Sequence, residues 1–95
     1  MSNRKERRKN RMETRVARLF DITNMTWRSP WLLEAWPKDA ESYGEFSEGR
    51  HENAVYIHQH GLNYTVTYKR GAMEWTGNKL RDAARMFKAL RLIGV

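Results

Sequence analysis

The sequence predicts one small α+β domain in which an antiparallel sheet carries helices on one face. Its length of 95 residues suits a single hydrophobic core. Residues 3–20 and 77–93 have apolar side chains at helical spacing, whereas residues 54–70 alternate with a period of two and are rich in β-branched and aromatic types. We therefore expect a flexible basic arm over residues 1–11, followed by a single domain over residues 12–95.

The first helix is expected to bury one apolar face late in its length. Met12, Val16, Leu19 and Phe20 fall on the same side of a helix. The residues before Met12 have no such face, and a short helix without a packing face is marginal in water. We expect the helix to be firm from Met12, and the arm before it to be frayed or disordered when free.

The next part of the chain predicts a connector and then a short second helix. Residues 21–29 are expected to form the connector. Ser29 and Pro30 suit an N-cap followed by a first-turn proline, so residues 31–36 are expected to be helical until Pro37 ends the helix. Three tryptophans lie here, and the sequence leaves open whether they belong to the core or to an interface: Trp27, Trp31 and Trp36.

The middle of the chain predicts a long loop followed by paired strands. Residues 38–53 are acidic and polar, as in a loop. Residues 54–70 alternate around a Gly-Leu-Asn turn, which indicates an antiparallel hairpin, and residues 72–75 suit a short third strand. The sheet face without helices would then expose some combination of Tyr56, His58, His60, Thr65, Thr67 and Lys69.

The last helix is expected over residues 77–93. Thr76 suits its N-cap, Trp75 and Leu80 suit a hydrophobic staple, and Gly94 suits the stop after its C-terminus. The apolar face of this helix is expected at Leu80, Ala83, Ala84, Phe87 and Leu90.

Composition narrows the functional classes. The chain has no cysteine, which excludes a disulfide scaffold, a cysteine-ligated metal site and a thiol nucleophile. It has neither an apolar run long enough to cross a bilayer nor an N-terminal secretory signal, so we expect a soluble, cytoplasmic protein. The net charge of +7 is divided into about +6 for residues 1–20, −4 for residues 21–68 and +5 for residues 69–95. Such segregation indicates a polyanionic partner.

The N-terminal run is the strongest functional feature. Residues 4–11 hold six basic residues and one acidic residue. The basic side chains repel one another and add nothing to a hydrophobic core. Phosphate groups would supply the missing compensation. The run resembles the arginine-rich RNA-binding segments of lambdoid phage N antitermination proteins. That resemblance covers eight residues and implies a helix that forms on an RNA hairpin.

A second basic patch is expected on the last helix. Residues 64–90 are also similar to the last part of double-stranded RNA-binding domains, in which a strand and a turn precede a basic helix; three-stranded DNA-binding modules fit the same pattern. Tyr56 could stack on a base if its ring is exposed. The expected nucleic-acid-binding residues are Arg4, Lys5, Arg7, Arg8, Lys9, Arg11, Arg15, Arg18, Arg81, Arg85, Lys88 and Tyr56.

Two other functions stay open. A small basic chain rich in tryptophan could be an interaction protein of the phage or mobile-element type that inhibits an acidic host protein or a nucleic-acid machine. His58 and His60 share a strand face, as metal ligands can. The stretch at residues 49–51 resembles HicA-type mRNA-cleaving toxins, which implies a ribonuclease histidine at His51.

We expect a regulatory protein that binds nucleic acid, with RNA preferred over DNA. We expect no catalytic residue, metal, cofactor, membrane or small-molecule substrate. The expected location is the cytoplasm, or the host cytoplasm if a phage encodes the chain.

Overall fold

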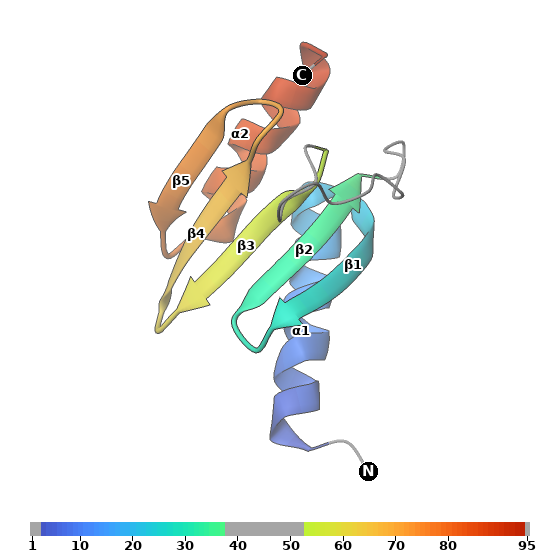
Figure 1. The fold of residues 1–95 in the computed structure, drawn as a ribbon, viewed down its shortest axis with the longest axis vertical. Helices are drawn as coiled ribbons and strands as arrows, with labels where there is room; N and C mark the ends of the chain where they lie inside the picture. Colours follow the sequence, from blue (N-terminus) through green and yellow to red (C-terminus); the bar gives the residue numbers. More distant parts are fainter. Residues whose placement is uncertain (1–2, 38–52, 95) are drawn as a thin grey trace.

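Five antiparallel strands and two helices make up the structure, a computed structural model that describes residues 3–37 and 53–94. The elements are α1 (Arg4–Phe20), β1 (Ile22–Ser29), β2 (Leu32–Pro37), β3 (Val55–His60), β4 (Asn63–Tyr68), β5 (Met73–Gly77) and α2 (Leu80–Leu92). The strands lie side by side in chain order, and both helices lie on one face of the sheet (Figure 1). The predicted α+β class is confirmed, but the sheet has five strands rather than two or three.

The predicted connector and short second helix are wrong, because these residues form the β1–β2 hairpin. Ser29 pairs with Leu32, so Pro30 and Trp31 form a two-residue turn instead of starting a helix. Residues 24–29 alternate between exposed and half-buried, a period of two that the sequence pattern already contained. A six-residue helix would leave its backbone poorly satisfied, whereas β2 bonds to a strand on each side.

The remaining strands follow the expected hairpin. His60 pairs with Asn63, and Gly61 takes a φ of 63° in the two-residue turn between them, a conformation that glycine adopts without strain. The third strand is confirmed as β5, but it extends to Gly77. Consequently Thr76 is a strand residue rather than the N-cap of the last helix.

The last helix begins later than the sequence predicts. Lys79 occupies the N-cap position of α2, without a side-chain hydrogen bond. Since Trp75 lies in β5, the predicted staple to Leu80 before a Thr76 cap does not describe this helix start. The C-terminal end agrees with the prediction, because Gly94 follows the C-cap with a φ of 84°.

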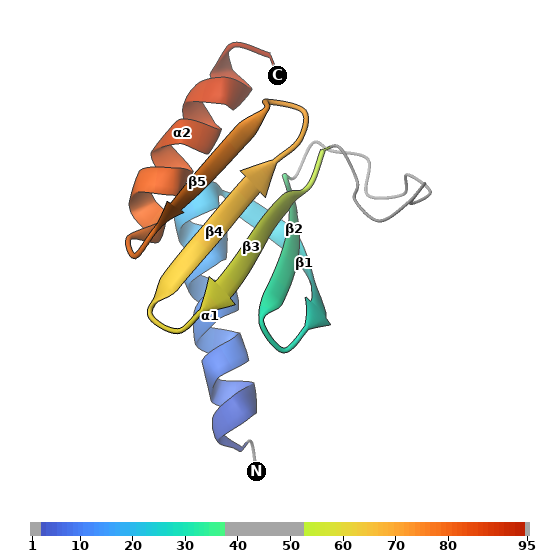
Figure 2. The same ribbon diagram turned by 60° about the vertical axis from the view of Figure 1, so that its left-hand side comes forward.

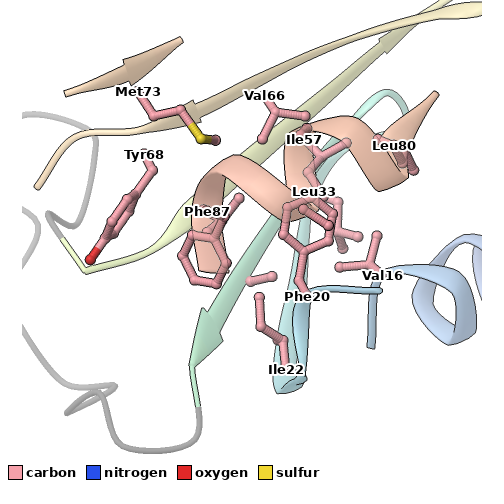
Figure 3. Packing of buried hydrophobic residues seen from close by; sticks show 14 of the residues in the cluster. Val16, Phe20, Ile22, Leu33, Ile57, Val66, Tyr68, Met73, Leu80 and Phe87 are labelled. Atoms are coloured by element: carbon pink, nitrogen blue, oxygen red, sulfur yellow. The ribbon is translucent and has the colours of Figure 1, made fainter. Parts of the chain in front are cut away.

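The core lies between the two helices and the helix-facing side of the sheet (Figure 3). Phe20 at the end of α1 contacts Phe87 of α2 with ring centroids 5.7 Å apart, and Tyr68 of β4 meets the Phe87 ring edge-on at 5.0 Å. Val16 is fully buried beside them. The apolar faces predicted for both helices are confirmed, with Leu19 and Leu90 half-buried at the margins.

The opposite face of the sheet holds a second, smaller cluster. Trp36, Ala54 and Tyr56 are buried there, with Leu32 packed against them. Glu34 is fully buried on the same face and accepts a hydrogen bond from Nε of Arg28. That bond is the main cause that raises the pKa of the Arg28 guanidinium above its ordinary value. The buried Glu34 carboxylate is therefore paired with Arg28 across the β1–β2 hairpin.

We expect Phe87→Ala to lower the free energy of unfolding by about 3–5 kcal/mol, because the substitution empties the space between Phe20 and Tyr68. Urea unfolding followed by circular dichroism measures the effect. Met86→Ala, in the same helix but exposed, is the matched control and should change stability by less than about 1 kcal/mol. Equal losses in the two variants would contradict the described core.

We expect Arg28→Met to destabilise the protein by about 1–3 kcal/mol, because it leaves the buried Glu34 carboxylate without its partner. The double variant Arg28→Met with Glu34→Met should recover most of that loss, since it removes the buried charge as well. Chemical unfolding of both variants tests the pair. A double variant no more stable than Arg28→Met alone would show that the carboxylate is not the cause.

Candidate functional site

The arginines of α1 form one stripe along the helix. Arg4, Arg8, Arg11, Arg15 and Arg18 are spaced alternately by four and three residues, and all five side chains are exposed. At 3.6 residues per turn this spacing, together with exposed Arg7, places them within an arc of about 100°. The stripe lies beside the apolar face that packs on the sheet, so it faces outward along one flank of the helix. We call these six residues the arginine stripe.

The acidic residues of α1 lie on its other flank. Glu13 accepts a hydrogen bond of 2.6 Å from Nε1 of Trp27 in β1, and Lys9 lies 5.7 Å from the centre of the Trp27 ring. Glu6 lies in the first turn, where its backbone N–H donates to the Asn3 side chain. The six arginines of α1 therefore share one flank, whereas Glu13 and Lys9 lie on the other flank at Trp27.

The start of α2 adjoins the stripe. Arg15, Arg18 and Leu19 of α1 line a groove of about 380 Å³ with Lys79, Leu80 and Arg81. Two basic segments separated by sixty residues of sequence therefore meet at one surface. Sequence reasoning did not select Lys79, because it placed the second basic patch at Arg81, Arg85 and Lys88, which share one side of the last helix. Lys79 lies between β5 and α2, at the N-cap of α2.

The hairpin end of the sheet forms a second groove beneath the stripe. A hollow of about 350 Å³ is lined by Arg8, Arg11, Met12, Arg15, Gln59 and Tyr64. The Arg15 guanidinium lies over the Tyr64 ring, with its Cζ 6.0 Å from the ring centre, and its Nη1 lies 3.4 Å from the Tyr64 hydroxyl. Sequence reasoning missed Gln59 and Tyr64, since it sought the aromatic contact on the opposite face.

The two grooves bring together some of the residues that were expected to bind nucleic acid and leave others outside. Arg85 and Lys88 are exposed on α2 but line neither groove. Tyr56 is 2% exposed, so the stacking role that required an exposed ring is not supported. Lys5 belongs to α1.

The three tryptophans have different environments. Trp36 is buried on the sheet face away from the helices, while Trp27 is half-buried against α1. Trp31 is 55% exposed in the β1–β2 turn. They do not form one cluster: Trp36 belongs to a core cluster and Trp27 borders the core, whereas an interface role for Trp31 stays a prediction.

The described histidines give little support to a metal-binding or catalytic role. His58 and His60 lie together on β3 with ring centroids 5.5 Å apart, and His60 Nε2 lies 2.9 Å from the hydroxyl of Thr65. Within residues 3–37 and 53–94, no group of three His, Asp or Glu side chains could hold a metal ion. His51, which carried the ribonuclease hypothesis, lies outside the described residues, as does the loop predicted over residues 38–53 except for its last residue.

The N-terminal half of α1 projects beyond the sheet (Figure 2). The helix begins at Arg4, earlier than the expected firm start at Met12. The side chains described before Met12 are all exposed, so this part of the helix has little tertiary packing to hold it. The flexibility of the arm when free stays a prediction.

Comparison with protein-family models, with curated proteins and with solved structures found no match. Among the described residues no helix combines the length and apolar character needed to cross a membrane. The function must therefore be argued from the charge and geometry of this surface.

We expect the backbone amides of residues 7–11 to exchange hydrogen faster than those of residues 12–20, because only the second half of α1 packs on the core. Adding an RNA hairpin should slow exchange selectively in residues 7–11. Exchange read by NMR at each amide measures both effects. Equal protection in the two halves of the free protein would contradict the predicted flexible arm.

Proposed function

We propose that this protein binds nucleic acid, RNA in preference to DNA, through the arginine stripe of α1 and the basic start of α2. The observation that carries the proposal is the convergence of Arg15 and Arg18 with Lys79 and Arg81 in one groove, while Glu13 is bonded on the opposite flank. A surface of one charge sign attracts ligands of the other sign. In this role the protein is a regulator that acts in the cytoplasm, without catalysis.

The dimensions of the stripe suit a phosphate backbone. Arg4 and Arg18 are fourteen residues apart, which corresponds to about 21 Å along a helix that rises 1.5 Å per residue. For scale, one strand of B-form DNA presents about six phosphates over such a length, since they are spaced about 3.4 Å apart along the axis, so six arginines match the charge of a nucleic-acid backbone of this extent. Arginine is suited to this task because its planar guanidinium can donate two parallel hydrogen bonds to one phosphate.

The preference for RNA rests on the composition of the arm and on its exposure. Arginine-rich segments that gain order on binding are a recurring form of RNA recognition. The first half of α1 has the required features, because it is exposed, carries arginines on one flank and projects past the sheet.

Binding should weaken steeply with salt. If the six arginines of the stripe each neutralise one phosphate, log affinity against log salt concentration should have a slope of about −4 to −5. Fluorescence anisotropy with a labelled RNA hairpin over a salt series measures the slope. Affinity that does not change between low and moderate salt would remove the electrostatic basis of the proposal.

The double variant Arg11→Gln with Arg18→Gln should reduce the magnitude of that slope by about 1.5, because it removes two phosphate contacts while keeping good helix formers. The matched control is Lys69→Gln with Arg70→Gln, which removes the same charge from the turn between β4 and β5, away from the stripe. The control should keep the wild-type slope. Equal effects in both variants would mean that net charge, rather than the stripe, causes binding.

Binding to an acidic protein is the second candidate function, and exposed Trp31 favours it. A tryptophan that is 55% exposed in a tight turn is a typical anchor for a protein interface. Nuclease treatment of a lysate before pull-down separates the candidates: a nucleic-acid partner is lost, whereas a protein partner is retained and should then depend on Trp31.

A further inference from the structure

The groove beneath the arginine stripe has features that phosphate binding does not require. Phosphate contacts need only cations, but this groove also contains a half-buried aromatic ring, Tyr64, and an exposed amide, Gln59. Both belong to the hairpin end of the sheet, where they pair with each other across β3 and β4. A ligand that uses all of these groups has a flat face for the ring, a hydrogen-bonding edge for the amide and an anionic group for the three arginines.

Gln59 breaks the sheet pattern at this place. It follows Val55 and Ile57 at the alternate positions of β3 that face the helices, and both of those residues are fully buried in the core. The pattern calls for an apolar residue at position 59, yet the chain has an exposed amide there. An amide side chain both donates and accepts hydrogen bonds, as the edge of a nucleobase does.

Tyr64 lies at the same boundary of the core. Its strand neighbours on that face, Val66 and Tyr68, are buried, whereas Tyr64 is only half-buried. The Arg15 guanidinium lies over the ring with its Cζ 6.0 Å from the ring centre, and its Nη1 lies 3.4 Å from the hydroxyl, a contact that a stacked base would replace. A flat group between ring and guanidinium needs about 7 Å, two contacts of about 3.5 Å each, so an outward shift of Arg15 by about 1 Å would admit it.

We propose that this groove binds one unpaired nucleotide of an RNA, with its base stacked on Tyr64 and its edge bonded to Gln59. Arg8 and Arg11, on the rim of the same groove, then contact the phosphates on either side. The volume of about 350 Å³ falls within the range of small-ligand sites. This inference rests on the proposed function and adds the kind of RNA that the protein selects: a hairpin loop or bulge rather than a continuous duplex.

The decisive experiment compares two RNAs of equal length, one a hairpin with 2-aminopurine at an unpaired loop position and the other a fully paired duplex. Wild-type protein should bind the hairpin more tightly and quench its 2-aminopurine fluorescence, because stacking on an aromatic ring does so. Tyr64→Leu should weaken hairpin binding by about 10-fold and abolish quenching, while duplex binding stays the same. Tyr64→Phe, which retains the ring, should behave as wild type.

A second variant guards against an effect on folding. Gln59→Ala changes an exposed side chain and should weaken hairpin binding without altering the unfolding midpoint or duplex affinity. If Tyr64→Leu and Gln59→Ala bind both RNAs as wild type does, the nucleotide site is wrong and the proposed function stands. If wild-type protein binds neither RNA in a salt-dependent way, the proposed function itself is wrong and the site falls with it.

Discussion

Burial of the apolar face of α1 determines what this molecule presents to solvent. Val16 and Phe20 are buried, and Phe20 meets Phe87 of α2, so the helix cannot rotate about its axis without opening the core. The direction of every other side chain of α1 is therefore fixed by that contact. Arg11, Arg15 and Arg18 each stand one position before an apolar residue of the helix, so they are turned from the apolar face by a constant angle. Packing of that face on the core therefore places the whole arginine stripe along one flank.

The same constraint separates the charges. Glu13 lies on the flank that faces β1, where the indole of Trp27 donates to it, and Lys9 lies against the same ring. No acidic residue of α1 lies on the other flank, where the stripe is. Cations repel one another at spacings of three and four residues and oppose the helix dipole near its N-terminus. Asn3 at the cap and Glu6 in the first turn offset part of this repulsion, so α1 is a helix that a bound anion would stabilise.

Sequence reasoning succeeded where a pattern depends on local periodicity. The apolar faces of both helices, the β3–β4 hairpin and the glycine after α2 all follow from residues within a turn or two of one another. It failed at residues 22–37, where Ser29 and Pro30 suit a helix start as well as a hairpin turn, and where pairing with β3 decides the outcome. The pairing of β2 with β3 joins residues far apart in sequence, so a pattern of a few neighbouring residues does not reveal it.

The candidate site shows the same division. The basic arm could be selected from composition, whereas its meeting with Lys79 and Arg81 requires the fold. Tyr56 and Tyr64 are both strand tyrosines of one hairpin, and period-two alternation assigns them to opposite faces. Which of the two tyrosine rings a ligand can reach depends on where the hydrophobic core ends on each face. Tyr56 is buried on the face away from the helices, and Tyr64 lies at the open end of the helix-facing side.

The strand order has a consequence for how the chain reaches this structure. Each strand pairs only with its neighbours in sequence, so the sheet can assemble by successive short closures, which is the topology associated with rapid folding. The helices are different, since α1 and α2 stand at opposite ends of the described chain and share the Phe20–Phe87 contact. During synthesis from the N-terminus, every strand leaves the ribosome before α2 does. The Phe20–Phe87 contact, which helps to fix the rotation of α1 and hence the direction of its arginines, can therefore form only after the last helix has been made.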